Sequence, residues 1–128
     1  MFVFMHHPPF DIGIRSADRI GLQQQMEFCE LIRPHRHQIR HLFFGHIHRP
    51  LGGSWLGIPS SSIRGMNHQV WFDMTGEELR GSFEPPAYAV VLISADKVVV
   101  HNHDFMDASE KFFLSDNPWD DWSCISSH

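Results

Sequence analysis

The sequence has neither a long apolar run nor a set of cysteines, and these two absences exclude whole classes of protein. No run approaches the roughly 20 apolar residues that a bilayer-spanning helix needs, and the first residues lack the basic segment of a signal peptide. The two cysteines, Cys29 and Cys124, are too few and too far apart for a disulfide framework. We therefore expect a cytoplasmic protein that does not enter a membrane.

Basic residues are scarce in the second half of the chain. Residues 65–128 carry three basic and eleven acidic groups, a net charge of −8. Residues 1–64 carry seven arginines and four acidic groups, a net charge of +3, so the whole chain has a net charge of −5. Such a balance is a poor electrostatic match for a polyanion. We therefore expect no nucleic-acid polymer among the partners.

Histidine, in contrast, is abundant, with 11 residues in a chain of 128. Seven of them lie between residues 6 and 48. Imidazole changes its charge near neutral pH and is a common metal ligand, so this density indicates metal ligation or pH-dependent chemistry. A hydrophobic fraction of 42% and a charged fraction of 20% are typical of a folded globular chain. The length predicts one compact unit.

The hydrophobic pattern of the first 44 residues predicts an α/β arrangement. The apolar run at residues 1–5 predicts a buried strand, and residues 41–44 predict a second one. Between them we expect a helix over about residues 19–33, capped by Asp18 and ended by Pro34. Its apolar stripe comprises Leu22, Met26, Cys29 and Ile32. A strand–helix–strand unit favours parallel pairing of its two strands.

The rest of the chain reads as β-rich. Residues 54–58 and 69–72 are strand candidates, and residues 88–103 predict a hairpin. We expect residues 1–105 to form the folded part and residues 106–128 to form an acidic C-terminal tail.

Two histidine motifs each follow a predicted buried strand. They are His6-His7-Pro8-Pro9 and Gly45-His46-Ile47-His48. The ends of parallel strands meet at the carboxyl edge of an open sheet, which is where such sheets bind their ligands. In extended backbone, residues i and i+2 point to the same side, so His46 and His48 are spaced to reach two metal ions about 3.5–4 Å apart. A single histidine there would be an ordinary loop residue, but two motifs in one unit favour metal ligation.

These motifs carry a family resemblance. Phe4–Pro9 and Phe44–Pro50 resemble the last two metal-binding motifs of the calcineurin-like metallophosphoesterases, most closely the cyclic-nucleotide and glycerophosphodiester phosphodiesterases. Gly65–Gln69 is similar to the Gly-Thr-x-His-Gln stretch of the glycerophosphodiesterase-like members. The resemblance covers most of residues 1–105. It implies an α/β fold that forms the carboxyl-terminal half of a metallophosphoesterase-type β-sandwich with flanking helices.

The resemblance also implies a metal centre and a reaction. His6 and His46 would bind one ion of a pair, and His48 would bind the other. The ions would be two divalent transition metals, which the donor chemistry allows to be Mn, Fe, Zn or Co. Together they would activate water against phosphorus. The implied enzyme is a metal-dependent phosphodiesterase acting on a small phosphodiester, such as a cyclic nucleotide or a glycerophosphodiester.

Four further residues are candidates for contact with the substrate or its phosphate. His68 would be a catalytic residue at the substrate rim, and His7 a neighbour that shapes the substrate-binding site without ligating metal. Arg49 and Arg64 have the donor geometry for bidentate hydrogen bonds to phosphate. Pairing of these arginines with the acidic tail is an equally good interpretation.

The family's earlier motifs, Asp-x-His, Gly-Asp and Gly-Asn-His-Asp or -Glu, do not occur in this sequence. The bridging carboxylate is therefore missing, and two cations held only by neutral imidazoles would repel each other. We expect the carboxyl-terminal half of a phosphoesterase that is inactive alone, with partial or no metal occupancy. The alternative is a non-catalytic remnant that binds metal or dimerises.

The predicted strands imply unpaired sheet edges. The strand at residues 2–5 and the hairpin at residues 88–103 would lack neighbours if half of the sandwich were absent. Unpaired edges invite pairing with another copy, so we expect a homo-oligomer.

Overall fold

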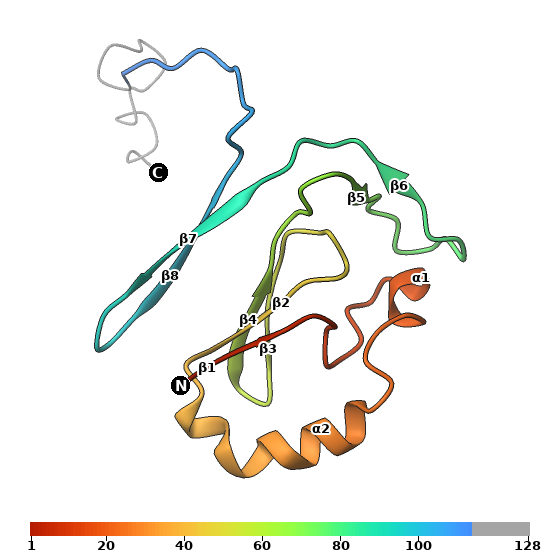
Figure 1. Cartoon of the computed structure of the whole chain (residues 1–128), viewed down its shortest axis with the longest axis vertical. Coiled ribbons are helices and arrows are strands. Elements are labelled where there is room, and N and C mark those ends of the chain that lie inside the picture. Colours follow the sequence, from red (N-terminus) through yellow and green to blue (C-terminus); the bar gives the residue numbers. More distant parts are fainter. Residues whose placement is uncertain (114–128) are drawn as a thin grey trace, which may run out of the picture.

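The computed structural model describes residues 1–113 as a mixed α/β chain, the predicted class (Figure 1). The helical elements are α1 (Arg15–Asp18), α2 (Gln25–Ile32) and the 3-10 helix η1 (Arg33–Gln38). The strands that form the main sheet are β1 (Phe2–Met5), β2 (His41–Phe44), β3 (Leu51–Trp55) and β4 (Ile58–Ser62). The remaining strands are β5 (Gln69–Val70), β6 (Gly81–Ser82), β7 (Tyr88–Ile93) and β8 (Val98–His103). None of the helices in this range is long and apolar enough to cross a membrane.

The main sheet has the strand order β1-β2-β4-β3. β1 pairs with β2 in parallel, as the strand–helix–strand pattern predicted, and β2 pairs with β4 in parallel. Met5 stands opposite Phe44 at the carboxyl ends of β1 and β2. The residues that follow these two strands are therefore neighbours in space. β5–β6 and β7–β8 form two separate antiparallel ladders.

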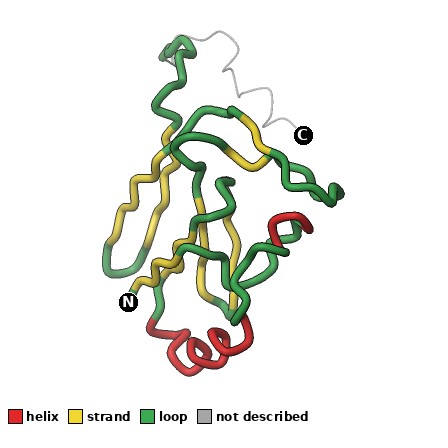
Figure 2. Tube along the Cα trace, turned by 45° about the vertical axis from the view of Figure 1, so that its right-hand side comes forward, coloured by secondary structure: helices red, strands yellow, loops and turns green. Residues whose placement is uncertain are grey.

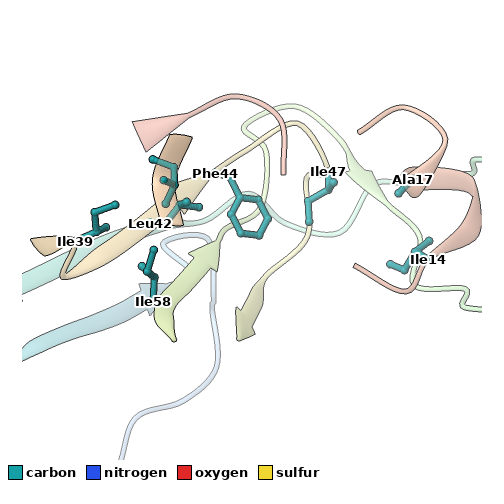
Figure 3. Close-up of a cluster of buried hydrophobic side chains, with 8 residues drawn as sticks. Ile14, Ala17, Ile39, Leu42, Phe44, Ile47 and Ile58 are labelled. Atoms are coloured by element: carbon teal, nitrogen blue, oxygen red, sulfur yellow. The ribbon is translucent and has the colours of Figure 1, made fainter. Parts of the chain in front are cut away.

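One face of the main sheet carries the hydrophobic core. Leu42 and Phe44 alternate along β2, as a half-buried strand requires, and both are buried with Ile58 of β4 (Figure 3). Ile39, just before β2, and Ile47, just after it, extend the same cluster. Trp55 at the end of β3 stacks on two rings, that of Phe10 in the loop before α1 and that of Phe28 in α2. The helical segment lies across the lower end of the strands in Figure 2.

The opposite face of the sheet is only partly covered. Phe2 and Phe4 of β1 stack on Phe43 of β2, and the β7–β8 hairpin lies alongside this face (Figure 2). Between sheet and hairpin is a mostly apolar cavity of about 430 Å³. The side chain of Phe4 is largely exposed, and β1 is an edge strand with no partner but β2 among the described residues.

The helix predicted over residues 19–33 was wrong in its bounds. Asp18 ends the short helix α1, and its carboxylate accepts hydrogen bonds from the backbone N–H groups of Ile12 and Gly13. Asp18 therefore stabilises the preceding loop and caps no later helix. The prediction that Pro34 ends the α-helix is confirmed, because α2 ends at Ile32; Pro34 then lies at the start of the 3-10 helix η1, where a helix needs no N–H donor. Of the predicted stripe only Ile32 is fully buried, and Met26 is largely exposed.

The strand predicted over residues 54–58 was also wrong. These residues span the end of β3, a tight turn and the start of β4. Leu56 and Gly57 in the turn have φ angles of 54° and 80°, the pattern of a two-residue hairpin turn. The hairpin predicted at residues 88–103 is confirmed as β7–β8. The predicted acidic tail lies largely outside the described residues, which end at residue 113.

Candidate metal centre

The two histidine motifs meet at the carboxyl edge of β1 and β2. The Nε2 atom of His6 lies 3.2 Å from the Nδ1 atom of His46. Donor atoms of His6, His7 and His46 all lie within 4.8 Å of one another, which makes this the group among the described residues that could hold a metal ion. The Nε2 atom of His46 is buried and has no hydrogen-bond partner. Three imidazoles thus converge from segments 40 residues apart in the sequence.

Backbone and packing contacts hold the two loops together. The N–H of Gly45 donates to the carbonyl of His6 at 3.0 Å, extending the β1–β2 pairing by one step. Pro8 and Pro9, the last two residues of the first motif, are fully buried, and their rings fix φ there. Ile47 is buried in the core between the two histidines of the second motif. The imidazoles therefore project from loops that are anchored on both sides.

The premise that His46 and His48 lie on extended backbone was wrong. Their φ angles are 67° and 46°, so both adopt the left-handed conformation. Histidine is enriched several-fold in this region among non-glycine residues, but the conformation still costs about 1–3 kcal/mol. Such local strain is concentrated at functional sites and persists only where the surroundings enforce it. Here the buried Ile47 between the two residues provides that constraint.

The two histidines of the second motif make different contacts. His46 faces His6 and His7, whereas the imidazole of His48 lies against His68, with ring centroids 4.6 Å apart. The Nδ1 atom of His48 lies 2.8 Å from the backbone carbonyl of His68. A carbonyl only accepts hydrogen bonds, so this contact requires a proton on Nδ1, and in the neutral ring Nε2 then keeps its lone pair. This grouping agrees with the predicted division of His6 and His46 from His48, and the ligand roles stay predictions.

Electrostatics favour the neutral form of His46. Burial, followed by the neighbouring imidazoles of His7 and His6, lowers the pKa of His46 below its ordinary value. A neutral imidazole is the form that ligates metal, whereas a protonated one cannot. The lowered pKa therefore keeps more of His46 in the neutral form that can ligate a metal ion.

The His6–His46 geometry fits a transition-metal ion. Two nitrogen ligands of one tetrahedral ion, each about 2.0–2.1 Å from it, lie about 3.3 Å apart. The observed separation of 3.2 Å matches that distance. Imidazole donors suit Zn, Fe, Mn and Co sites, and the buried Nε2 of His46 is free to carry the proton once Nδ1 is bound. Within residues 1–113 this group contains no carboxylate that could bridge to a second ion.

The arginines proposed for phosphate contact are engaged elsewhere. Arg49 donates through Nη1 to the Glu84 carboxylate at 2.8 Å and to the Val70 carbonyl at 3.1 Å. Arg64 donates to Asp104 at 2.9 Å. Neither acidic partner lies in the predicted tail. Substrate binding by Arg49 stays a prediction, and its present contacts tie the second histidine motif to the strand β6 region.

A cavity of about 510 Å³ opens beside the histidine cluster. Its lining residues are His7, Arg19, Ile20, Gly21, Leu22, Gln23, Gln24 and His46. Arg19 at its margin is bound to Glu77, which also pairs with Arg15 of α1. The segment between α1 and α2 therefore forms one wall of the space in front of the imidazoles.

Sequence reasoning missed the polar residues that build these surroundings. The sequence pattern predicted that Arg19 and its neighbours belong to a helix, so it did not indicate that they line a cavity. The resemblance of the Gly65–Gln69 stretch implies no role for Gln69, yet its side chain is fully buried. The available clue in the sequence was the position of Gln69, a polar residue that follows Gly65 by four residues and directly precedes the apolar Val70.

Comparisons with known proteins support a phosphodiesterase relationship. The chain is 44% identical over 118 residues to the probable cyclic nucleotide phosphodiesterase of Rhodopseudomonas palustris, which covers 91% of this chain and 43% of that protein. It is 36% identical over 67 residues to the probable cyclic nucleotide phosphodiesterase of Synechococcus, covering 48% of this chain and 26% of that protein. It is 32% identical over 89 residues to the probable glycerophosphodiester phosphodiesterase of Arcobacter nitrofigilis, covering 68% and 32%.

The chain spans less than half the length of these curated relatives. No protein-family model matches it. The predicted resemblance to cyclic-nucleotide and glycerophosphodiester phosphodiesterases is confirmed by these relatives, and it is consistent with a metallophosphoesterase-like family.

Proposed function

We propose that this chain forms part of the active site of a metal-dependent phosphodiesterase that hydrolyses a small phosphodiester. The observation that carries the proposal is the convergence of His6 Nε2 and His46 Nδ1 at 3.2 Å, the spacing of two ligands on one ion. The names of the relatives support the substrate class, which we propose to be a cyclic nucleotide or a glycerophosphodiester.

Each histidine has a separate task in this proposal. His6 and His46 hold one divalent ion, and His48 presents its unprotonated Nε2 to a second. Bound ions of this kind supply Lewis-acid stabilisation of the charge that develops at phosphorus. His7, which belongs to the cluster and lines the cavity, shapes the substrate site, and His68 is a catalytic residue at the rim beside His48.

The substrate occupies the cavity in front of His46. Arg19 at its margin supplies positive charge, and Gln23 and Gln24 supply hydrogen-bonding amides. Arg49 contributes to substrate binding through its position directly after His48, where its guanidinium is held by Glu84. An anionic phosphodiester would therefore meet two amides and two arginines, and it would have to compete with Glu77 for Arg19 and with Glu84 for Arg49.

The whole enzyme requires more residues than this chain supplies. We propose that the main sheet and the β7–β8 hairpin form half of a metallophosphoesterase-type β-sandwich, with residues 1–105 as its folded part and residues 106–128 as a tail. The bridging carboxylate and the remaining ligands come from outside the matched portion. In this proposal the complete centre holds two ions of Mn, Fe, Zn or Co, and this chain alone binds them partially and is inactive.

A second candidate is a non-catalytic module that binds metal or dimerises. It is favoured by the all-imidazole composition of the cluster within residues 1–113. The free edge of β1 and the exposed ring of Phe4 offer a surface for a second copy, so homo-oligomerisation belongs to both candidates. Both also share a cytoplasmic location, where the thiol of Cys29 would stay reduced.

Hydrolysis of a chromogenic phosphodiester separates the two candidates. The chain is assayed with added Mn²⁺ or Zn²⁺, alone and mixed with the separately produced remaining portion of the Rhodopseudomonas relative. Turnover in the mixture that is abolished by His46→Ala, but kept by His35→Ala at an exposed position of η1, supports the enzyme. Metal binding without turnover in either sample supports the non-catalytic module.

A further inference from the structure

Gln69 is a fully buried polar residue whose side-chain amide forms hydrogen bonds with the backbone of the loop that precedes it. Its Oε1 accepts from the backbone N–H of Gly65 at 2.7 Å, and its Nε2 donates to the carbonyl of the same residue at 2.8 Å. A longer contact of 3.4 Å joins Nε2 to the carbonyl of Glu84. Both ends of the amide are thus used to fix one peptide segment, residues 65–69, which we call the 65–69 latch.

The 65–69 latch lies in close contact with the imidazole of His48. The carbonyl of His68 within the latch accepts the hydrogen bond from Nδ1 of His48. A Cβ atom on Gly65 would lie 2.6 Å from that Nδ1 and 2.8 Å from Cγ of the same ring. Only a residue without a side chain allows this approach, so Gly65 and the His68 carbonyl together define where the imidazole of His48 lies.

The latch is anchored independently of the metal cluster. Glu84, whose carbonyl contacts Gln69, also holds Arg49 by an ion pair at 2.8 Å. The carbonyl of Arg49 accepts from the buried hydroxyl of Ser62 in β4 at 2.6 Å. His48 is therefore held through its own ring by the latch and through its next residue by β4 and Glu84.

We propose that Gln69 is a positioning residue that sets the tautomer of His48. By fixing the carbonyl of His68, the latch keeps the proton on Nδ1 of His48 and leaves Nε2 as the ligating nitrogen. Metal-bound histidines characteristically donate their other ring N–H to such a carbonyl, which fixes ring orientation and raises ligand basicity. The inference rests on the proposed function, because it assigns Gln69 a role toward the metal through His48.

A purely structural role for Gln69 predicts something different. If Gln69 only completes the packing around β5, its loss changes stability but leaves the protonation pattern of His48 as it was. If the latch sets the tautomer, its loss frees the ring to carry its proton on either nitrogen. The tautomer is measured in metal-free protein, so the result does not depend on catalysis.

The test is the imidazole ¹⁵N spectrum of His48 in metal-free protein at neutral pH. In the wild type we expect the chemical-shift pattern of an Nδ1–H tautomer. In Gln69→Met, which keeps the volume and removes all three contacts of the amide, we expect mixed tautomers. Gln38→Met, the same change at an exposed glutamine, is the matched control and should keep the wild-type pattern. Dispersed amide spectra establish that each variant is folded.

A second variant covers the case in which Gln69→Met does not fold. Gly65→Ala keeps the glutamine and inserts a methyl group at the 2.6 Å contact, so it should displace His48 and mix its tautomers. Titration with Zn²⁺ adds a second readout. The affinity for the Zn²⁺ ion that His48 ligates should drop about 10–100-fold in both variants.

The outcomes separate this inference from the proposed function. A wild-type His48 with its proton on Nε2, or a folded Gln69→Met that keeps a pure Nδ1–H pattern, overturns the positioning role. Absence of metal binding to every variant contradicts the proposed function. The tautomer measurement still decides the positioning role, because it is made on metal-free protein.

Discussion

The ion pair between Arg49 and Glu84 should contribute measurably to stability, because it is partly shielded from water. The side chains are 15% and 34% exposed, and Nη1 of Arg49 lies 2.8 Å from the carboxylate. The guanidinium also packs over the ring of Phe72 and donates to the Val70 carbonyl. The chain offers a matched comparison in Arg80 and Glu78, which are 3.9 Å apart and 54% and 83% exposed.

The burial of the two pairs sets the expected magnitudes. Exposed ion pairs contribute about 0.2–1 kcal/mol, and breaking a fully buried pair costs about 3–5 kcal/mol. The intermediate exposure of Arg49 and Glu84 therefore predicts a coupling free energy of about 1–2 kcal/mol. For Arg80 and Glu78 the length and exposure predict a coupling of less than about 0.3 kcal/mol.

Two double-mutant cycles measure these values by urea unfolding. One cycle combines Arg49→Met with Glu84→Gln, and the other combines Arg80→Met with Glu78→Gln. We expect the coupling of the first pair to exceed that of the second at least threefold, and to persist better in added salt. Equal couplings, or a first coupling near zero, would refute the view that Arg49 is held as part of the scaffold around His48.

Three further predictions concern the core, pH and self-association. Leu42→Ala should lower the free energy of unfolding by about 2–5 kcal/mol in urea titrations, since Leu42 is fully buried, whereas Leu31→Ala at an exposed position should change it by less than about 0.5 kcal/mol. Burial lowers the pKa of His41 below 6.5, so the unfolded chain binds a proton more readily and stability falls as pH drops from about 7.5 to about 5.5. The urea midpoint of His41→Gln should fall less over that range, and an equal fall contradicts the assignment. Phe4→Asn should shift sedimentation towards smaller species, because Phe4 lies exposed on an edge strand; unchanged sedimentation argues against this surface.

The sequence was most informative where pattern and packing agree. The runs at residues 2–5 and 41–44 are short, apolar and bounded by histidine and glycine, and each forms a strand. The prediction that both are buried was right for β2 and wrong for β1, which is an edge strand with Phe4 exposed. Their parallel pairing brought His6 and His46 together, since residues after neighbouring parallel strands share one sheet edge. The capping rule failed for Asp18. Its carboxylate accepts from backbone N–H groups of the preceding loop, and the rule cannot distinguish these from the N–H groups of a following helix.

The surroundings of His48 could not be predicted, because they depend on contacts between distant segments. Spacing alone treated His46 and His48 as equivalent, but a buried Ile47 between two left-handed residues turns the rings towards different neighbours. The role of Gln69 depends on how close Gly65 comes to His48, and no local propensity encodes that distance. Sequence patterns therefore predicted the edge of the sheet at which the site lies, and tertiary contacts determined its internal geometry.

Calorimetric titration with Zn²⁺ tests most directly whether the imidazoles after β1 and β2 form a cation site. The account predicts that the wild-type chain binds the ion, that His46→Ala loses this binding, and that His37→Ala, at an exposed position of η1, retains it. Equal heats of binding for the wild type and His46→Ala would contradict the assignment.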